Sequence, residues 1–169
     1  AVVFTVGLVQ DIGVLFLVRT RSLEYGGAMG ISRTKGVHLA KAEREARGVD
    51  HAQVGAVLCA NWKLPRLLIE VIRHHHFAEF DEEISEEHKK IVQVVNLASL
   101  LVDFLFDSDS EELWERLDDR AKTFFGFGPK KVVELLGKIF GPAKTIGEIF
   151  SIQVDAEAAQ RAGVDFVAV

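Results

Sequence analysis

The stretch VFTVGLVQDIGVLF, residues 3–16, is apolar nearly all the way round when it is wound as a helix. Such a pattern predicts a helix that is buried on most of its faces. Gln10 and Asp11 lie in its middle, and a buried carboxylate must be paired. The stretch therefore predicts a helical protein in which Gln10 and Asp11, on the first helix, are buried in the interior.

The rest of the chain also has helical periodicity, without sustained period-two alternation between hairpin turns. We therefore predict an all-α fold. Residues 25–32 are rich in glycine and predict a loop or irregular turn, whereas residues 34–47 predict a polar helix that Gly48 ends. Gly128–Pro129 and Gly141–Pro142 predict breaks between shorter helices in the C-terminal part.

Two further helices carry histidines. Asp50 has the capping-box spacing to Gln53, which places His51 in the first turn of a helix. Another helix begins near Pro65 and ends in three successive histidines, residues 74–76. Because successive helical residues point about 100° apart, we expect at most two of these three side chains to face inward.

Composition limits the classes of protein that fit. The 169 residues suit one compact domain or a piece of a slightly larger one, and 20 Lys and Arg against 25 Asp and Glu give a net charge of -5. We therefore expect no nucleic-acid partner. The single cysteine, Cys59, cannot close an intrachain disulfide, so we expect a buried, inert thiol in a reduced, cytoplasmic setting.

The apolar N-terminal stretch raises the question of a membrane segment. We expect no segment to approach the uninterrupted length of a membrane helix, because Gln10 and Asp11 interrupt the stretch and Arg19 ends it. The stretch also lacks the basic leader and small-residue cleavage site of a signal peptide. No membrane partner is expected.

Several motifs in order resemble the HDOD domain, an HD-related output domain of the HD superfamily. Residues 7–13, Gly-Leu-Val-Gln-Asp-Ile-Gly, resemble that family's Gly-Leu-Leu-His-Asp-Ile-Gly segment. The other motifs that resemble the family are Glu45, Gly48, Asp50-His51-Ala52, Val54-Gly55-Ala56, Leu58, Trp62, Leu64-Pro65, Ile72-Arg73-His74-His75-His76 and Val94-Val95-Asn96-Leu97-Ala98. The resemblance covers about residues 4–106.

The resemblance implies a domain layout. An HDOD domain carries a further helical region before the segment that resembles residues 7–13, and this chain starts almost at that segment. We therefore expect the chain to supply the C-terminal part of the domain, without its N-terminal helical region. Residues 1–106 should form the HDOD-like core, and residues 107–169 should add C-terminal helices that pack on the same domain.

The resemblance also implies a depleted metal site. Gln10 stands where the catalytic families of the superfamily place histidine, and Asn96 stands where we assign their last aspartate. A neutral amide is a poor ligand for the transition metals that imidazole holds well. Asp11, His51 and His75 remain, with His76 nearby. We therefore expect a ligand-binding pocket of Gln10, Asp11, His51, His75, His76 and Asn96, with no metal and no cofactor.

Structural roles remain open for the same residues. Asp11 could be a helix-embedded carboxylate that its neighbours satisfy, and His51 could pack against a neighbouring helix. We expect His74 to face solvent or to pack outside the pocket. Asn96, Ser99 and Asp103 form a polar stripe on a long helix that Ser85 caps, and this stripe predicts a solvated face.

The resemblance implies a non-enzymatic signal-transduction domain, bacterial and cytoplasmic, that binds a signalling protein, other domains of the same polypeptide or a small ligand. Two alternatives stay open. One is a metal-dependent phosphohydrolase acting on a nucleotide or cyclic dinucleotide through Asp11, His51 and His75. The other is a structural module that forms homo-oligomers through its apolar first helix.

Overall fold

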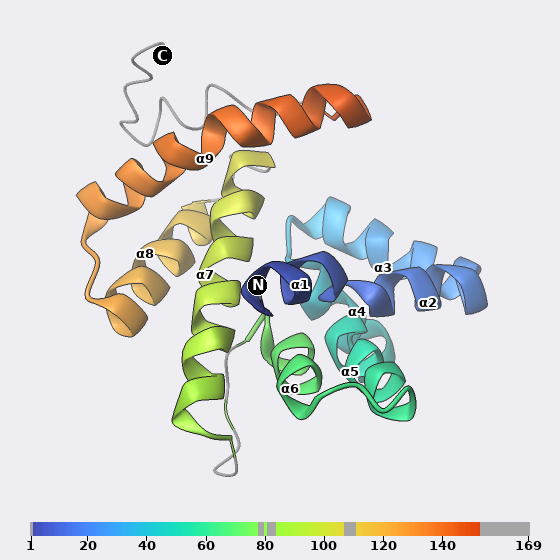
Figure 1. The fold of residues 1–169 in the computed structure, drawn as a ribbon. Helices are drawn as coiled ribbons and strands as arrows, with labels where there is room; N and C mark the ends of the chain where they lie inside the picture. The colour runs from blue at the N-terminus through green and yellow to red at the C-terminus, as the bar shows by residue number, and fades with distance from the viewer. Residues whose placement is uncertain (1, 78–79, 81–83, 107–110, 153–169) are drawn as a thin grey trace. The chain divides into compact units, whose positions relative to one another are not determined.

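The computed structural model describes residues 2–77, 80, 84–106 and 111–152, and every regular element within them is an α-helix (Figure 1). This confirms the all-α prediction. The helices are α1 (Val2–Val9), α2 (Ile12–Thr20), α3 (Ser22–Lys35), α4 (Leu39–Arg47), α5 (His51–Asn61), α6 (Arg66–His74), α7 (Glu86–Phe106), α8 (Glu111–Phe125) and α9 (Pro129–Phe150).

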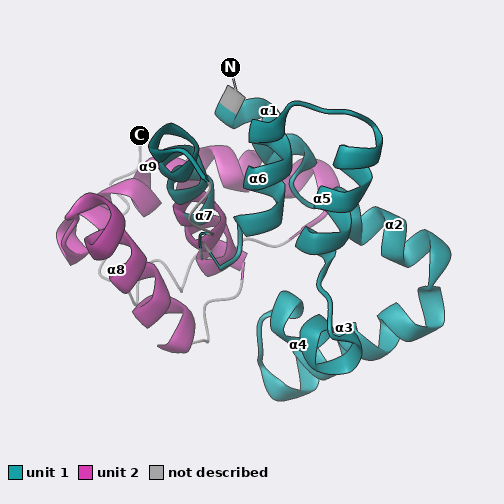
Figure 2. Cartoon of the chain, turned by 90° about the horizontal axis from the view of Figure 1, so that it is seen from below, with its two compact units in different colours: residues 1–96 teal, residues 97–169 magenta. Residues whose placement is uncertain are grey.

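The chain divides into two compact units, Ala1–Asn96 and Leu97–Val169 (Figure 2). The boundary falls inside α7, ahead of the boundary that we expected after residue 106. The second unit has a core of its own, because buried side chains from Leu97 to Leu136 on α7, α8 and α9 cluster together. That residues 107–169 pack on the HDOD-like core stays a prediction.

The first unit is built around α5, which packs against α2, α4 and α6. Helix α1 packs on α6, and α3 packs on α4. Ala56 and Cys59 of α5 form a buried cluster with Ile72 of α6. The packing of α2 on α5 depends on glycine, because a Cβ at Gly13 would lie 1.9 Å from the carbonyl oxygen of His51. The first turn of α2 therefore lies close to the start of α5.

The apolar N-terminal stretch is two helices rather than one. Helix α1 ends at Val9, a turn follows at Gln10 and Asp11, and α2 begins at Ile12. Our prediction of one continuous helix is wrong here. Because of this break, Asp11 lies in a turn between two helices. Its side chain is 55% exposed at the edge of the unit and is not embedded in a buried helix.

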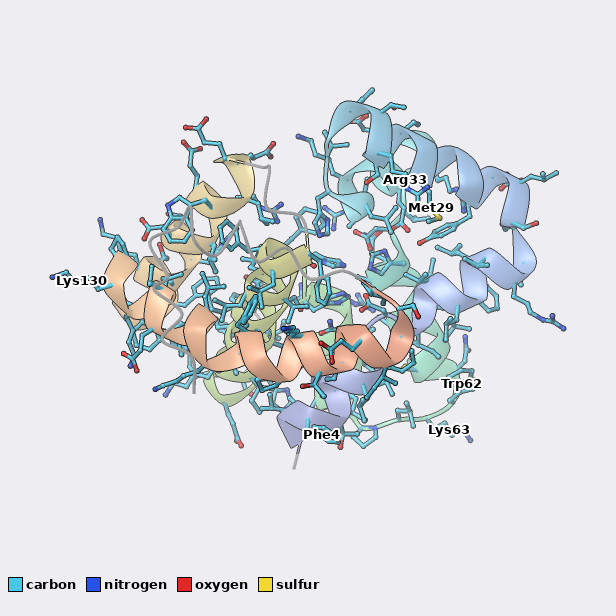
Figure 3. The ribbon with its side chains drawn as sticks, turned by 90° about the horizontal axis from the view of Figure 1, so that it is seen from above. Phe4, Met29, Arg33, Trp62, Lys63 and Lys130 are labelled. Atoms are coloured by element: carbon cyan, nitrogen blue, oxygen red, sulfur yellow. The ribbon has the colours of Figure 1, made fainter. Side chains whose placement is uncertain are left out.

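By length and composition alone, Val3–Thr20 is apolar enough to cross a membrane, with a mean hydropathy of 1.6 over 18 residues. Our expectation that no segment approaches such a length is therefore wrong for this stretch. Its large side chains are poorly covered, and Phe4 is 72% exposed (Figure 3). Trp62, which follows α5, is 58% exposed as well (Figure 3). The cytoplasmic location stays a prediction.

The glycine-rich residues 25–32 are helical, because they lie inside α3. The loop prediction is wrong, since the burial of Tyr25 and Ala28 against neighbouring helices outweighs the low helix propensity of glycine. The predicted polar helix over residues 34–47 is also interrupted. Gly36 ends α3 in the left-handed conformation, with φ 62°, and α4 begins at Leu39.

Local capping follows the sequence. The Asp50 side chain accepts a hydrogen bond from the backbone of Gln53, and the Gln53 side chain returns one to the backbone of Asp50. Gly48 ends α4 with φ 76°, and Ser85 accepts a hydrogen bond from the backbone N–H of His88 at the start of α7. These predictions are confirmed. Gly141–Pro142, in contrast, does not break α9, which runs through it.

Candidate functional site

Four predicted site residues come together in the first unit. Asp11, His51, His75 and His76 each offer one ligand atom, and these atoms all lie within 4.8 Å of one another. Asp11 comes from the turn between α1 and α2, His51 from the first turn of α5, and the two other histidines from the C-terminal end of α6. We call these four residues the histidine cluster.

Asp11 is the carboxylate of the histidine cluster. Its Oδ1 lies 3.3 Å from Nε2 of His51 and 3.3 Å from Nε2 of His75. Gln10 lies next to Asp11, and its amide nitrogen donates to Oδ2 of that carboxylate over 3.4 Å. Because Asp11 is half exposed and both histidines are buried, the carboxylate is the solvent-facing edge of the histidine cluster.

His51 is oriented by Glu43, a residue that our sequence reasoning missed. Oε2 of Glu43 accepts hydrogen bonds from the backbone N–H of His51 at 2.8 Å and from its Nδ1 at 2.6 Å. A carboxylate only accepts, so Nδ1 carries the hydrogen and Nε2 faces Asp11. Glu45, the glutamate that resembles the family motif, is instead an exposed partner of Lys35. The available signal was the helical spacing of Ala40 and Glu43, which share the buried face of α4.

His75 and His76 contribute differently to the histidine cluster. Nδ1 of His75 donates to the carbonyl oxygen of Ile72 at 2.7 Å, which leaves its buried Nε2 without a hydrogen-bond partner. Nε2 of His76 lies 2.7 Å from Nε2 of His51. His74 lies outside, with its ring 6.1 Å from that of Phe80. The expectation that at most two of the three histidines face inward is confirmed.

Asn96 lies beside the histidine cluster, and its side chain contacts the backbone of His75 and His76. The buried amide nitrogen donates to the carbonyl oxygens of His75 at 2.7 Å and His76 at 3.0 Å. The predicted solvated stripe is therefore wrong for Asn96. Helix α7 is held beside α6 by a second contact, in which Nδ1 of His88 hydrogen-bonds Glu70. The amide nitrogen of Asn96 thus fixes the end of α6, whereas its Oδ1 is buried and makes no hydrogen bond.

Arg44 joins the two histidine-bearing segments. Its Nε lies 2.6 Å from Oδ2 of Asp50, the capping residue just before His51. Its guanidinium carbon lies 3.8 Å from the centre of the Phe77 ring, which directly follows His76. A cation over an aromatic face is attracted to it. Arg44 therefore restrains both Asp50, at the start of α5, and Phe77, which follows His76.

Close contacts within the histidine cluster shift the pKa values of its members. Burial alone would lower the pKa of His51, but hydrogen bonds to Asp11 and Glu43 outweigh it and raise this pKa to about 9. Burial would raise the pKa of Asp11, yet its contacts with His51 and His75 hold that pKa far below its usual range. Burial and the neighbouring imidazoles lower the pKa of His76. The contacts with Asp11 and Glu43 therefore favour the protonated form of His51.

The donor set suits one divalent transition-metal ion. Nε2 of His51, Nε2 of His75, Nε2 of His76 and a carboxylate oxygen of Asp11 converge within 4.8 Å of one another. Nε2 of His75 is buried, makes no hydrogen bond of ordinary geometry and has Oδ1 of Asp11 as its neighbour at 3.3 Å. Imidazole and carboxylate suit first-row metals, and a bound metal would supply Lewis acidity and an acidified water. Among the described residues no second group of this kind accompanies it.

The remaining reactive side chain lies elsewhere. Cys59 is buried in α5, as we expected, and its burial raises the pKa of the thiol. A raised pKa disfavours the nucleophilic thiolate. Cys59 therefore belongs to the core of the first unit and not to the site.

Comparisons with known proteins agree with the motifs. The model of the HDOD domain family matches residues 1–78. An uncharacterized protein of Treponema pallidum (strain Nichols) is 34% identical over 77 residues, which is 46% of this chain and 14% of that relative. This chain therefore aligns with only a small part of the relative's length. No solved structure matches the chain.

The matched segment carries most of the site. Asp11, His51, His75 and His76 lie inside it, whereas Asn96 lies beyond it. The match lies in the N-terminal part of this chain, and it does not support our narrower expectation that the chain supplies only the C-terminal part of the domain. HDOD domains are a signalling-associated family of the HD superfamily. Residues 1–78 of this chain are therefore similar to the HDOD domain family.

Proposed function

We propose that the first unit is a non-catalytic signalling domain, which recognises a partner protein or a small ligand at the histidine cluster. One observation carries this proposal. Neutral amides stand at two positions where the superfamily has charged or imidazole ligands, and their nitrogens donate elsewhere, Gln10 to Asp11 and Asn96 to the carbonyl oxygens of His75 and His76. The ligand atoms that remain, those of the histidine cluster, form a single group, and a neutral amide is a weaker ligand than the imidazole or carboxylate it replaces.

The position of Asp11 supports binding at this edge. Asp11 is the exposed member of the cluster, and the histidines behind it are held by Glu43 and by the backbone of Ile72. A rigid group of imidazoles behind an exposed carboxylate is a pre-organised site, which lowers the entropic cost of binding. A ligand or partner that engages Asp11 would change the charge balance of His51. The partner is a signalling protein or another domain of the same polypeptide, in a bacterial cytoplasm.

The test is metal analysis of the purified protein together with phosphodiesterase assays in added manganese. We expect no turnover of cyclic dinucleotides or model diesters, whether or not a single cation binds. Asp11→Ala removes the shared carboxylate, and His74→Ala is the matched control because His74 lies outside the histidine cluster. Bound metal with turnover, both abolished by Asp11→Ala and unaffected by His74→Ala, would overturn the proposal.

The second candidate is a metal-dependent phosphohydrolase. The observation that favours it is the convergence of four ligand atoms within 4.8 Å, because a metal-bound water becomes nucleophilic near neutral pH. The assay above decides between the two candidates.

A third candidate, a module that forms homo-oligomers, is favoured by the exposed side chains of Phe4, Leu8 and Leu15. Light scattering at increasing protein concentration tests it. A monomer at all concentrations would rule it out.

A further inference from the structure

A buried pair of oxygen atoms lies behind the histidine cluster. The hydroxyl oxygen of Tyr25 and Oε1 of Glu43 are both buried, and neither has a partner at strict hydrogen-bond geometry. Beyond the effect of burial, an interaction between the two side chains nevertheless raises the pKa of Tyr25 and lowers the pKa of Glu43. Tyr25 lies on α3 and Glu43 on α4, two helices that pack together. The other oxygen of Glu43, Oε2, already accepts two hydrogen bonds from His51. The second carboxylate oxygen of Glu43, Oε1, is thus buried, and so is the Tyr25 hydroxyl, which could donate a hydrogen bond to it.

We propose that Tyr25 is a positioning residue, whose hydroxyl donates to Oε1 of Glu43 and so fixes the carboxylate that orients His51. The proposal rests on the proposed role of the histidine cluster as the binding pocket. It joins the two unsatisfied buried groups, each of which is costly to leave unpaired. The resulting chain runs from the Tyr25 hydroxyl through Glu43 to Nδ1 of His51. It keeps Nε2 of His51 turned toward Asp11.

The electrostatic environment of Tyr25 agrees with this chain. Burial raises the pKa of the Tyr25 phenol, and the negative charge of Glu43 raises it further. The phenol therefore keeps its hydrogen and can donate it. The guanidinium of Arg47 lies 5.5 Å from the ring centre of Tyr25, which fixes the ring from a second side. Groups that orient a ligating histidine from behind typically change metal affinity about 10- to 100-fold when they are removed.

The first test is the proton NMR signal of the hydrogen on Nδ1 of His51 at one neutral pH without metal. In the wild-type protein we expect a strongly deshielded, slowly exchanging signal, because this hydrogen is bonded to Glu43. Tyr25→Phe should leave the fold intact and speed the exchange of this signal. Ser32→Ala is the matched control, because it removes another hydroxyl of α3, one that donates to the carbonyl oxygen of Val37. The control should not change the signal.

The second test is a double-mutant cycle of Tyr25→Phe and Glu43→Gln, measured by urea unfolding. A direct hydrogen bond to a carboxylate predicts a coupling of about tenfold in the unfolding equilibrium constant. Additive effects together with an unchanged Nδ1 signal in Tyr25→Phe would overturn the proposal, because Tyr25 would then only fill space.

Zinc titration by calorimetry separates the proposal from the function on which it rests. We expect Tyr25→Phe to weaken zinc binding about tenfold or more and Ser32→Ala to leave it unchanged. Unchanged zinc affinity in Tyr25→Phe, measured on a wild-type protein that binds zinc, would contradict the positioning role. If the wild-type protein binds no zinc but Tyr25→Phe still speeds the exchange of the Nδ1 hydrogen, the link from Tyr25 to His51 stands and the histidine cluster is not a cation pocket.

Discussion

Replacing Gly13 by alanine should destabilise the first unit, although alanine is the better helix former. A Cβ at Gly13 would lie 1.9 Å from the carbonyl oxygen of His51 and 2.8 Å from the backbone nitrogen of Gly55. Contacts below 3.0 Å are essentially never seen for a real Cβ, so α2 and α5 would have to separate by roughly 1 Å. Both contacted groups are backbone atoms, which cannot rotate away as a flexible side chain can.

The magnitude follows from two opposing effects. Alanine is favoured over glycine inside a helix by about 1 kcal/mol. Overpacking typically costs about 1–3 kcal/mol and occasionally more, and a backbone clash belongs at the upper end. We therefore expect Gly13→Ala to lower the free energy of unfolding by about 2 kcal/mol or more. The measurement is urea unfolding followed by far-ultraviolet circular dichroism.

Two other glycines give a graded comparison. A Cβ at Gly7 in α1 meets nothing within 4 Å, so Gly7→Ala should be neutral or stabilising by up to about 1 kcal/mol. A Cβ at Gly55 would lie 3.0 Å from Cγ2 of Ile72, a side-chain atom, so Gly55→Ala should fall between the other two. If Gly13→Ala unfolds at the same urea concentration as Gly7→Ala, the close approach of α2 and α5 is wrong.

Three further predictions concern the histidine cluster. Gln10→His adds an imidazole beside Asp11 and should raise the affinity for a divalent metal in calorimetry. Asn96→Ala removes the donor to the carbonyl oxygens of His75 and His76, and it should lower the free energy of unfolding by about 2 kcal/mol in a urea titration. Because the pKa of His51 is raised to about 9 in the folded protein, its stabilising contribution is fully present below about pH 6.5 and is lost as the pH rises through 9. The free energy of unfolding of the metal-free protein should fall over that window by on the order of 3 kcal/mol.

Each of these outcomes has a control. Lys90→Ala changes an exposed residue on the same helix as Asn96 and should leave stability within about 0.5 kcal/mol of the wild type. His51→Gln should abolish the alkaline loss of stability, and its persistence in that variant would assign the loss to another group. If Gln10→His leaves metal affinity unchanged and only destabilises the protein, the missing imidazole is not what limits the site.

Local features of the sequence predicted much of the first unit. The Asp50–Gln53 capping box, the left-handed Gly48 and the position of His51 in the first turn of α5 depend on neighbours within one helical turn. Such interactions are encoded by short-range spacing, and they do not require knowledge of the fold. The same is true of the limit on inward-facing histidines, because the helix geometry alone separates residues 74–76.

Features that depend on packing could not be obtained in this way. Residues 25–32 have the composition of a loop, yet Tyr25 and Ala28 bury their side chains and the segment is helical. Asn96 lies on a stripe that looks solvated in the sequence, but its amide is buried against the end of α6. In both cases the gain from burial against another helix outweighs the local preference.

The sequence by itself determined that this chain is helical, where its best capped helices begin, and that an aspartate and three histidines belong to one family motif set. Only the tertiary structure decided which carboxylate orients His51. Glu43 and Glu45 are two residues apart, so they point about 200° apart on α4, and the packing of α4 on α3 and α5 buries Glu43 and leaves Glu45 outside. The physical reason is that a helical pattern fixes which residues share a face, whereas the neighbouring helices decide which face is buried.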